Sequence, residues 1–75
     1  MTLEEIMNLL AKYGDPVLRV MNHGWYCGVE VFNPSEGIRF DVRSDWDHPT
    51  AMEAANLCME RLNASLSQLA TRGGM

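Results

Sequence analysis

Apolar and polar residues alternate over two neighbouring stretches, residues 25–32 and 37–43, which are separated by Asn33-Pro34-Ser35-Glu36-Gly37. Side chains of a strand alternate between the two faces of a sheet, so this pattern predicts a β-hairpin with one apolar face. The apolar face comprises Trp25, Cys27, Val29, Val31, Ile38, Phe40 and Val42. The opposite face carries Tyr26, Gly28, Glu30, Phe32, Arg39, Asp41 and Arg43, and we expect it to meet water or a partner.

A third strand is predicted at residues 17–21, where β-branched and other apolar residues precede the turn sequence Asn22-His23-Gly24. The pattern leaves its facing open. If Leu18 and Val20 face the core, then Val17, Arg19 and Met21 join the polar face of the hairpin. The three strands would then form an antiparallel meander.

The first helix is predicted at residues 3–13, because Thr2 and Glu5 have the spacing of a capping box. Its apolar residues recur at helical spacing: Leu3, Ile6, Met7, Leu10 and Tyr13. Gly14 is expected to end the helix in the left-handed conformation, and Pro16 prevents its continuation.

The second helix is predicted at residues 50–70. It begins either with Thr50 and Glu53 as a second capping box or with Pro49 in the first turn. Its apolar stripe contains Ala51, Ala55, Cys58, Leu62, Leu66 and Leu69, flanked by Ala54, Leu57 and Met59. Glycines at positions 73 and 74 should stop the helix, leaving a frayed tail at residues 71–75.

These elements predict an α+β fold: one domain, residues 1–75, in the order α-β-β-β-α. Both helices should pack on the apolar face of the three-stranded antiparallel sheet, because the apolar faces must be buried together. The result is a two-layer sandwich whose second sheet face is open.

This element order is similar to that of the double-stranded-RNA-binding domain, and His23 lies in the loop where that family places a groove-contacting histidine. The resemblance implies RNA binding through His23 and nearby arginines. The family's phosphate-binding lysine cluster, however, is replaced here by Thr50-Ala51-Met52-Glu53-Ala54. We therefore expect phosphate to be repelled at this position.

The chain contains ten acidic and six basic residues, for a formal charge of -4 and a pI near 4.9. This balance disfavours nucleic acid and anionic membrane surfaces as partners. No apolar run approaches the ~20 residues of a membrane span, and no basic segment leads into an apolar one at the amino terminus. We expect a cytoplasmic protein, in the host cytoplasm if the chain is phage-encoded.

Catalytic, metal and cofactor sites are not predicted. Cysteine, histidine and aspartate occur, but no pair has a ligating spacing such as Cys-x-x-Cys. Cys27 and Cys58 fall on core-facing positions, which predicts reduced, buried thiols rather than nucleophiles. We expect a non-enzymatic chain without a metal or cofactor.

A partner site is predicted on the open sheet face, because aromatic and arginine side chains are enriched at interface hot spots. The candidate residues are Met21, Tyr26, Phe32, Arg19, Arg39 and Arg43. The alternative is a solvated sheet, with Tyr26 lying over Gly28 and the arginines paired to Glu30 and Asp41. Self-association through this face or through an edge strand is a third possibility.

Trp46 allows two interpretations, because it lies among Asp45, Asp47 and His48 just before the second helix. It could anchor a partner that the aspartates steer by their charge. It could instead fold over the end of the core while the aspartates cap the helix.

Together these features predict a small acidic module that binds, and could inhibit, another protein. By size and charge it resembles the accessory and counter-defence proteins of bacteriophages and mobile elements. The alternatives are a nucleic-acid-binding domain of the RNA-binding topology and a self-associating structural protein.

Overall fold

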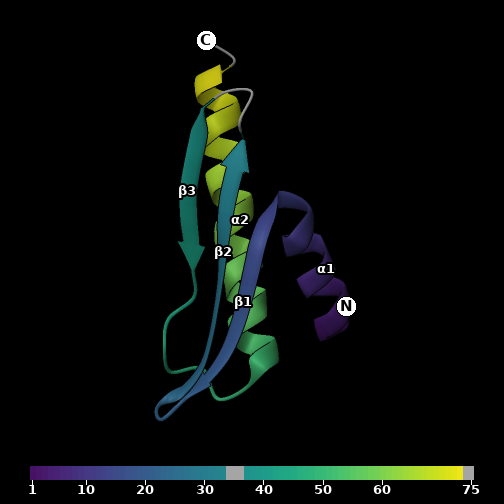
Figure 1. The fold of residues 1–75 in the computed structure, drawn as a ribbon, viewed down its shortest axis with the longest axis vertical. Helices are drawn as coiled ribbons and strands as arrows, with labels where there is room; N and C mark the ends of the chain where they lie inside the picture. The colour runs from purple at the N-terminus through teal and green to yellow at the C-terminus, as the bar shows by residue number, and fades with distance from the viewer. Residues whose placement is uncertain (34–36, 74–75) are drawn as a thin grey trace.

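Two helices and three strands follow one another in the computed structural model, which describes residues 1–33 and 37–73 (Figure 1). The predicted α-β-β-β-α order is confirmed. The elements are α1 (Leu3–Tyr13), β1 (Gly14–Met21), β2 (Gly24–Asn33), β3 (Ile38–Arg43) and α2 (Ala51–Gly73).

The strands form one antiparallel sheet in the order β1-β2-β3, with β2 in the centre. Gly28 of β2 lies opposite Val17 of β1 and Arg43 of β3, which sets the register across the sheet. α2 packs on all three strands, and α1 packs on α2, β1 and β2 (Figure 1). The structure is therefore the predicted two-layer α+β sandwich.

The core lies between the sheet and the helices, and its strand residues are those that alternation predicted. Two alanines of α2, Ala54 and Ala55, are fully buried, and their small side chains let the helix approach the sheet closely. The buried apolar residues are Ile6, Leu10, Cys27, Val29, Val31, Val42, Ala54, Ala55, Cys58 and Leu62.

The capping box of α1 is present. The Glu5 N–H donates to the Thr2 hydroxyl at 3.2 Å, and the Thr2 N–H donates to the Glu5 carboxylate at 3.1 Å. Hydrogen bonds from the backbone and the side chain of Thr2 lower the pKa of the Glu5 carboxyl. Tyr13, predicted on the apolar stripe, is 43% exposed, because the chain passes directly from it into β1.

The predicted left-handed cap at Gly14 is wrong. Gly14 has an extended backbone with φ 179°, and it begins β1 three residues earlier than predicted. Its N–H still donates to the Leu10 carbonyl, so it closes α1. Glycine is required here for space, since a Cβ would lie 1.7 Å from the Glu30 carbonyl oxygen of β2.

α2 begins at Ala51, and Thr50 is its N-cap: the Thr50 hydroxyl accepts from the Glu53 N–H at 3.2 Å. This favours the predicted start at Thr50 over a start at Pro49. The helix continues to Gly73, past the predicted end at residue 70. The predicted turn residues 34–36, the tail residues 74–75 and the side chain of Leu69 lie outside the described part of the chain.

Leu18 and Val20 do lie on the helix-covered face of β1, which settles the facing that the pattern left open. Leu18 packs against the core, whereas Val20 is 66% exposed. The difference arises because the β1–β2 turn projects beyond the helices (Figure 1). Across the described ranges, no helix is both long and apolar enough to cross a membrane.

Candidate functional site

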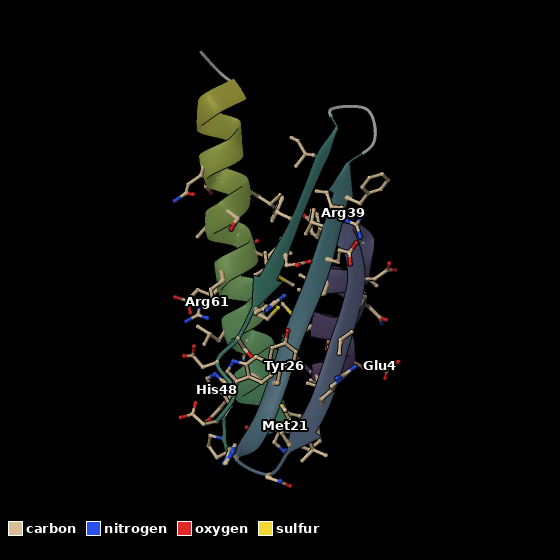
Figure 2. All side chains as sticks on the ribbon, turned by 60° about the vertical axis from the view of Figure 1, so that its left-hand side comes forward. Glu4, Met21, Tyr26, Arg39, His48 and Arg61 are labelled. Atoms are coloured by element: carbon tan, nitrogen blue, oxygen red, sulfur yellow. The ribbon has the colours of Figure 1, made fainter. Side chains whose placement is uncertain are left out.

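One face of the sheet carries no helix, and we call it the open face (Figure 2). The side chains that the register places on it include all the predicted face residues. They are Asp15, Val17, Arg19 and Met21 on β1, Tyr26, Gly28, Glu30 and Phe32 on β2, and Arg39, Asp41 and Arg43 on β3.

A bulge interrupts the pairing of β2 with the chain that follows β3. The Ser44 N–H donates to the Cys27 carbonyl at 2.8 Å, and the Ser44 hydroxyl accepts from the Cys27 N–H at 2.9 Å. Had this register continued, Trp25 would face Trp46. Instead the Trp25 N–H donates to the His48 carbonyl at 2.7 Å, so two extra residues are looped out.

The bulge brings Trp46 onto the open face, where its ring stacks on Tyr26. The ring centroids are 4.7 Å apart, and the planes differ by 18°. Trp46 remains 52% exposed, so the interpretation in which it folds over the end of the core is wrong. Asp45 does not cap α2 either, because its carboxylate lies 3.4 Å from the Arg61 guanidinium.

Arg61 of α2 fixes this bulge from the other layer of the sandwich. Its Nη1 donates to the Arg43 carbonyl at 2.8 Å and to the Asp45 carboxylate at 3.4 Å. Sequence reasoning missed Arg61 and Ser44, because their partners are 16 to 18 residues away and share no motif with them.

A shallow hollow of about 400 Å³ lies on the open face beside the aromatic stack. Tyr26, Trp46, Val17 and Arg19 contribute to its lining. The Tyr26 hydroxyl lies over Gly28, as predicted, and a Cβ at Gly28 would be 2.6 Å from that oxygen. The missing side chain in the central strand therefore allows the tyrosine to lie along the sheet.

The charges around the hollow are largely paired. Asp15, Glu30 and Asp41 form a row across the three strands. Arg39 forms an ion pair with Glu30, and Arg43 lies 3.5 Å from Asp41, as the solvated-sheet interpretation predicted. Such exposed pairs contribute little to stability, so their main effect is on the charge of the face.

Phe32 and Met21 do not join the aromatic stack. Phe32 is 59% exposed and lies opposite Arg39, about 20 Å along the strand from Tyr26. Met21 lies beside the β1–β2 turn (Figure 2). The predicted residues therefore divide into a central site at Tyr26, Trp46, Arg19 and Arg43, two outlying apolar side chains, and Arg39, which lies beside Phe32.

The remaining chemical groups form no reactive constellation. Cys27 and Cys58 are free and buried, and a hydrogen bond to Cys27 together with burial raises the pKa of the Cys58 thiol. His23 lies exposed in the β1–β2 turn, and His48 lies after the bulge, where pairing with β2 resumes at Trp25. Among the described residues, no three His, Cys, Asp or Glu side chains are grouped to bind a metal.

No family model, curated protein or solved structure matches this chain. The similarity to the double-stranded-RNA-binding domain therefore rests on the order of the elements alone.

Proposed function

We propose that this chain is a small, acidic, non-enzymatic module that binds another protein through its open face. The observation that carries the proposal is the Tyr26–Trp46 stack, which the bulge after β3 holds on that face. A large aromatic pair whose indole is half in solvent is the kind of side-chain group that anchors protein interfaces.

Preorganisation supports this function. The stack is held in place before any partner arrives, because Ser44 and Arg61 fix the start of the bulge and the bond from the Trp25 N–H to the His48 carbonyl fixes its end. Side chains that are already ordered lose less conformational entropy on binding. The module therefore presents a fixed anchor and needs no chemistry of its own, as expected of a protein that inhibits a partner by covering its surface.

Charge indicates what kind of surface the partner has. The chain carries a formal charge of -4, and the exposed residues Asp45 and Asp47 flank Trp46. We propose a partner with a basic surface around an apolar pocket for the indole, because opposite potentials speed association and favour the correct orientation.

The nucleic-acid alternative receives less support from this face. Two of the three arginines on the open face, Arg39 and Arg43, are paired with carboxylates. The row of Asp15, Glu30 and Asp41 crosses the strands beside them. Phosphate binding depends on Lys and Arg side chains that are free to neutralise the phosphates. A protein partner is therefore the better fit to the open face.

Removing either ring of the stack is expected to weaken capture of the partner about tenfold or more, because anchor residues at the centre of an interface dominate its binding energy. The test compares affinity-tagged wild type with the Tyr26→Ala and Trp46→Ala variants. Each is incubated with nuclease-treated lysate of the source cells, and the captured proteins are quantified by mass spectrometry.

Glu60→Ala serves as the matched control, because Glu60 is exposed on α2 in the other layer. It should capture the partner as wild type does. Circular dichroism must show that all four proteins are folded. The proposal is wrong if folded Tyr26→Ala and Trp46→Ala proteins retain the wild-type partner in full.

A further inference from the structure

β1 is an edge strand with unpaired backbone groups. The backbone N–H and C=O groups of successive strand residues point alternately to the two sides of the strand. Those of Trp25 and Cys27 in β2 point towards β3 and the chain that follows it, so those of Tyr26 and Gly28 point towards β1. The residues opposite them, Arg19 and Val17, point their backbone groups inwards. Those of Leu18 and Val20 point out of the sheet and bond to no other described residue.

This edge also exposes three apolar side chains. Val17, Met21 and Val20 are all exposed, the first two on the open face and Val20 on the other. Figure 2 shows β1 at the margin of the sheet, and Figure 1 shows that α1 diverges from β1 on this side of the sheet. An exposed edge strand that is apolar on both faces is a template for pairing with another strand.

Two charges of the open face have no ion-pair partner among the described residues, and both lie on β1. They are Asp15 and Arg19, whereas Glu30, Asp41, Arg39 and Arg43 are all paired. Asp15 and Arg19 are two residues before and two residues after Val17. A second copy of β1 that runs antiparallel, with the two Val17 residues opposite each other, would thus place Arg19 opposite Asp15 and Asp15 opposite Arg19.

We propose that two copies of this chain pair through their β1 edges, antiparallel, with Val17 opposite Val17 on the two-fold axis. Asp15 of each copy then faces Arg19 of the other, and opposite charges at such positions are favourable. The Leu18 N–H donates to the Pro16 carbonyl of the second copy, and the Val20 N–H donates to the Gly14 carbonyl.

Pro16 limits the hydrogen bonds of this register, because it has no N–H to donate to the Leu18 carbonyl of the second copy. It occupies a position whose backbone points out of the sheet, so no bond within the sheet is lost. A register shifted to centre on Arg19 would place two arginines opposite each other. A register centred on Leu18 would leave Asp15 facing Met21. Only the register centred on Val17 among these pairs both free charges.

The pairing goes beyond the proposed function and does not depend on it. The two three-stranded sheets would join into one, and both hollows, which border β1 through Val17 and Arg19, would lie on a single continuous face. The exposed Val20 would come next to Tyr13 of the second copy, since it lies opposite Gly14.

Charge reversal tests the pairing by analytical ultracentrifugation over a wide range of concentration. Wild type should reach twice its chain mass of 8.5 kDa. Asp15→Arg or Arg19→Asp alone should weaken association about tenfold or more, because both symmetric pairs become repulsive. An equal mixture of the two variants should dimerise again, since each then faces its opposite. Both positions are exposed, so the variants should fold.

A cysteine at position 17 tests the register. Val17→Cys should form a covalent dimer under mild oxidation, because opposed residues of a non-hydrogen-bonded pair lie close together. Met21→Cys is the control, since position 21 faces Tyr13 and not itself. A wild type that stays monomeric overturns the proposal. So does a dimer whose association is unchanged by both charge reversals. A dimer that is cross-linked in the Met21→Cys variant but not in the Val17→Cys variant also overturns it.

Discussion

Gly14→Ala is expected to destabilise the fold by about 3 kcal/mol or more, because the new Cβ would lie 1.7 Å from the Glu30 carbonyl oxygen. That oxygen belongs to the backbone of the central strand, so the first residue of β1 must move away from β2. A domain of this size has a total stability of roughly 5 kcal/mol. Urea denaturation followed by circular dichroism should show most of this stability lost.

Gly37→Ala is the matched control. Gly37 has φ 67°, and a Cβ there would meet no atom within 4 Å. The substitution should therefore destabilise the fold only by the strain of a left-handed alanine, about 1 kcal/mol. If Gly14 acted only as a left-handed cap, the two variants would behave alike. Equal losses of stability would therefore contradict the close approach of β1 and β2 at Gly14.

Ser44→Ala is expected to cost about 2 kcal/mol and to disorganise the aromatic stack. Ser44 is almost fully buried, and its hydroxyl accepts from the Cys27 N–H at 2.9 Å and donates to the Asp45 carbonyl at 3.0 Å. Alanine would leave the buried Cys27 N–H without an acceptor, and an unpaired buried donor lowers the free energy of unfolding. Near-ultraviolet circular dichroism should report the weakened stacking of Tyr26 and Trp46.

Ser65→Ala controls for the loss of a serine hydroxyl. Ser65 lies half-buried on α2, far along the chain from the bulge, and alanine is a better helix former by about 0.5 kcal/mol. The Ser65→Ala variant should be as stable as wild type or slightly more stable. Its near-ultraviolet circular dichroism spectrum should be unchanged. An unchanged spectrum in Ser44→Ala would mean that Arg61 alone holds the bulge.

Local signals were sufficient to predict most of the fold. The Thr2 capping box predicted the first residues of α1, and strict alternation along β2 and β3 predicted which side chains face the helices. Gly14 was misread because glycine after a helix usually adopts a left-handed conformation. Glycine is needed at position 14 because the Glu30 backbone lies too close for a Cβ. That contact depends on a strand that follows later in the chain.

The candidate site was only half predictable for a similar reason. Tyr26 over Gly28 follows from their spacing on one strand, and it was foreseen. The position of Trp46 was not, because it depends on a two-residue bulge that Ser44 and Arg61 stabilise through long-range hydrogen bonds. Alternation cannot reveal where a strand stops following its register.

Site-specific photo-cross-linking in the source cells tests the central claim, that the open face binds a protein. A photoreactive phenylalanine analogue replaces Arg43, which lines the hollow with Tyr26 and Trp46, in one variant and Asn56, exposed on α2, in another. Mass spectrometry then identifies the cross-linked species. We expect the Arg43 position to yield a cross-link to one partner protein and the Asn56 position to yield none. Cross-links from Asn56 alone would contradict the account and place the binding surface on the helices.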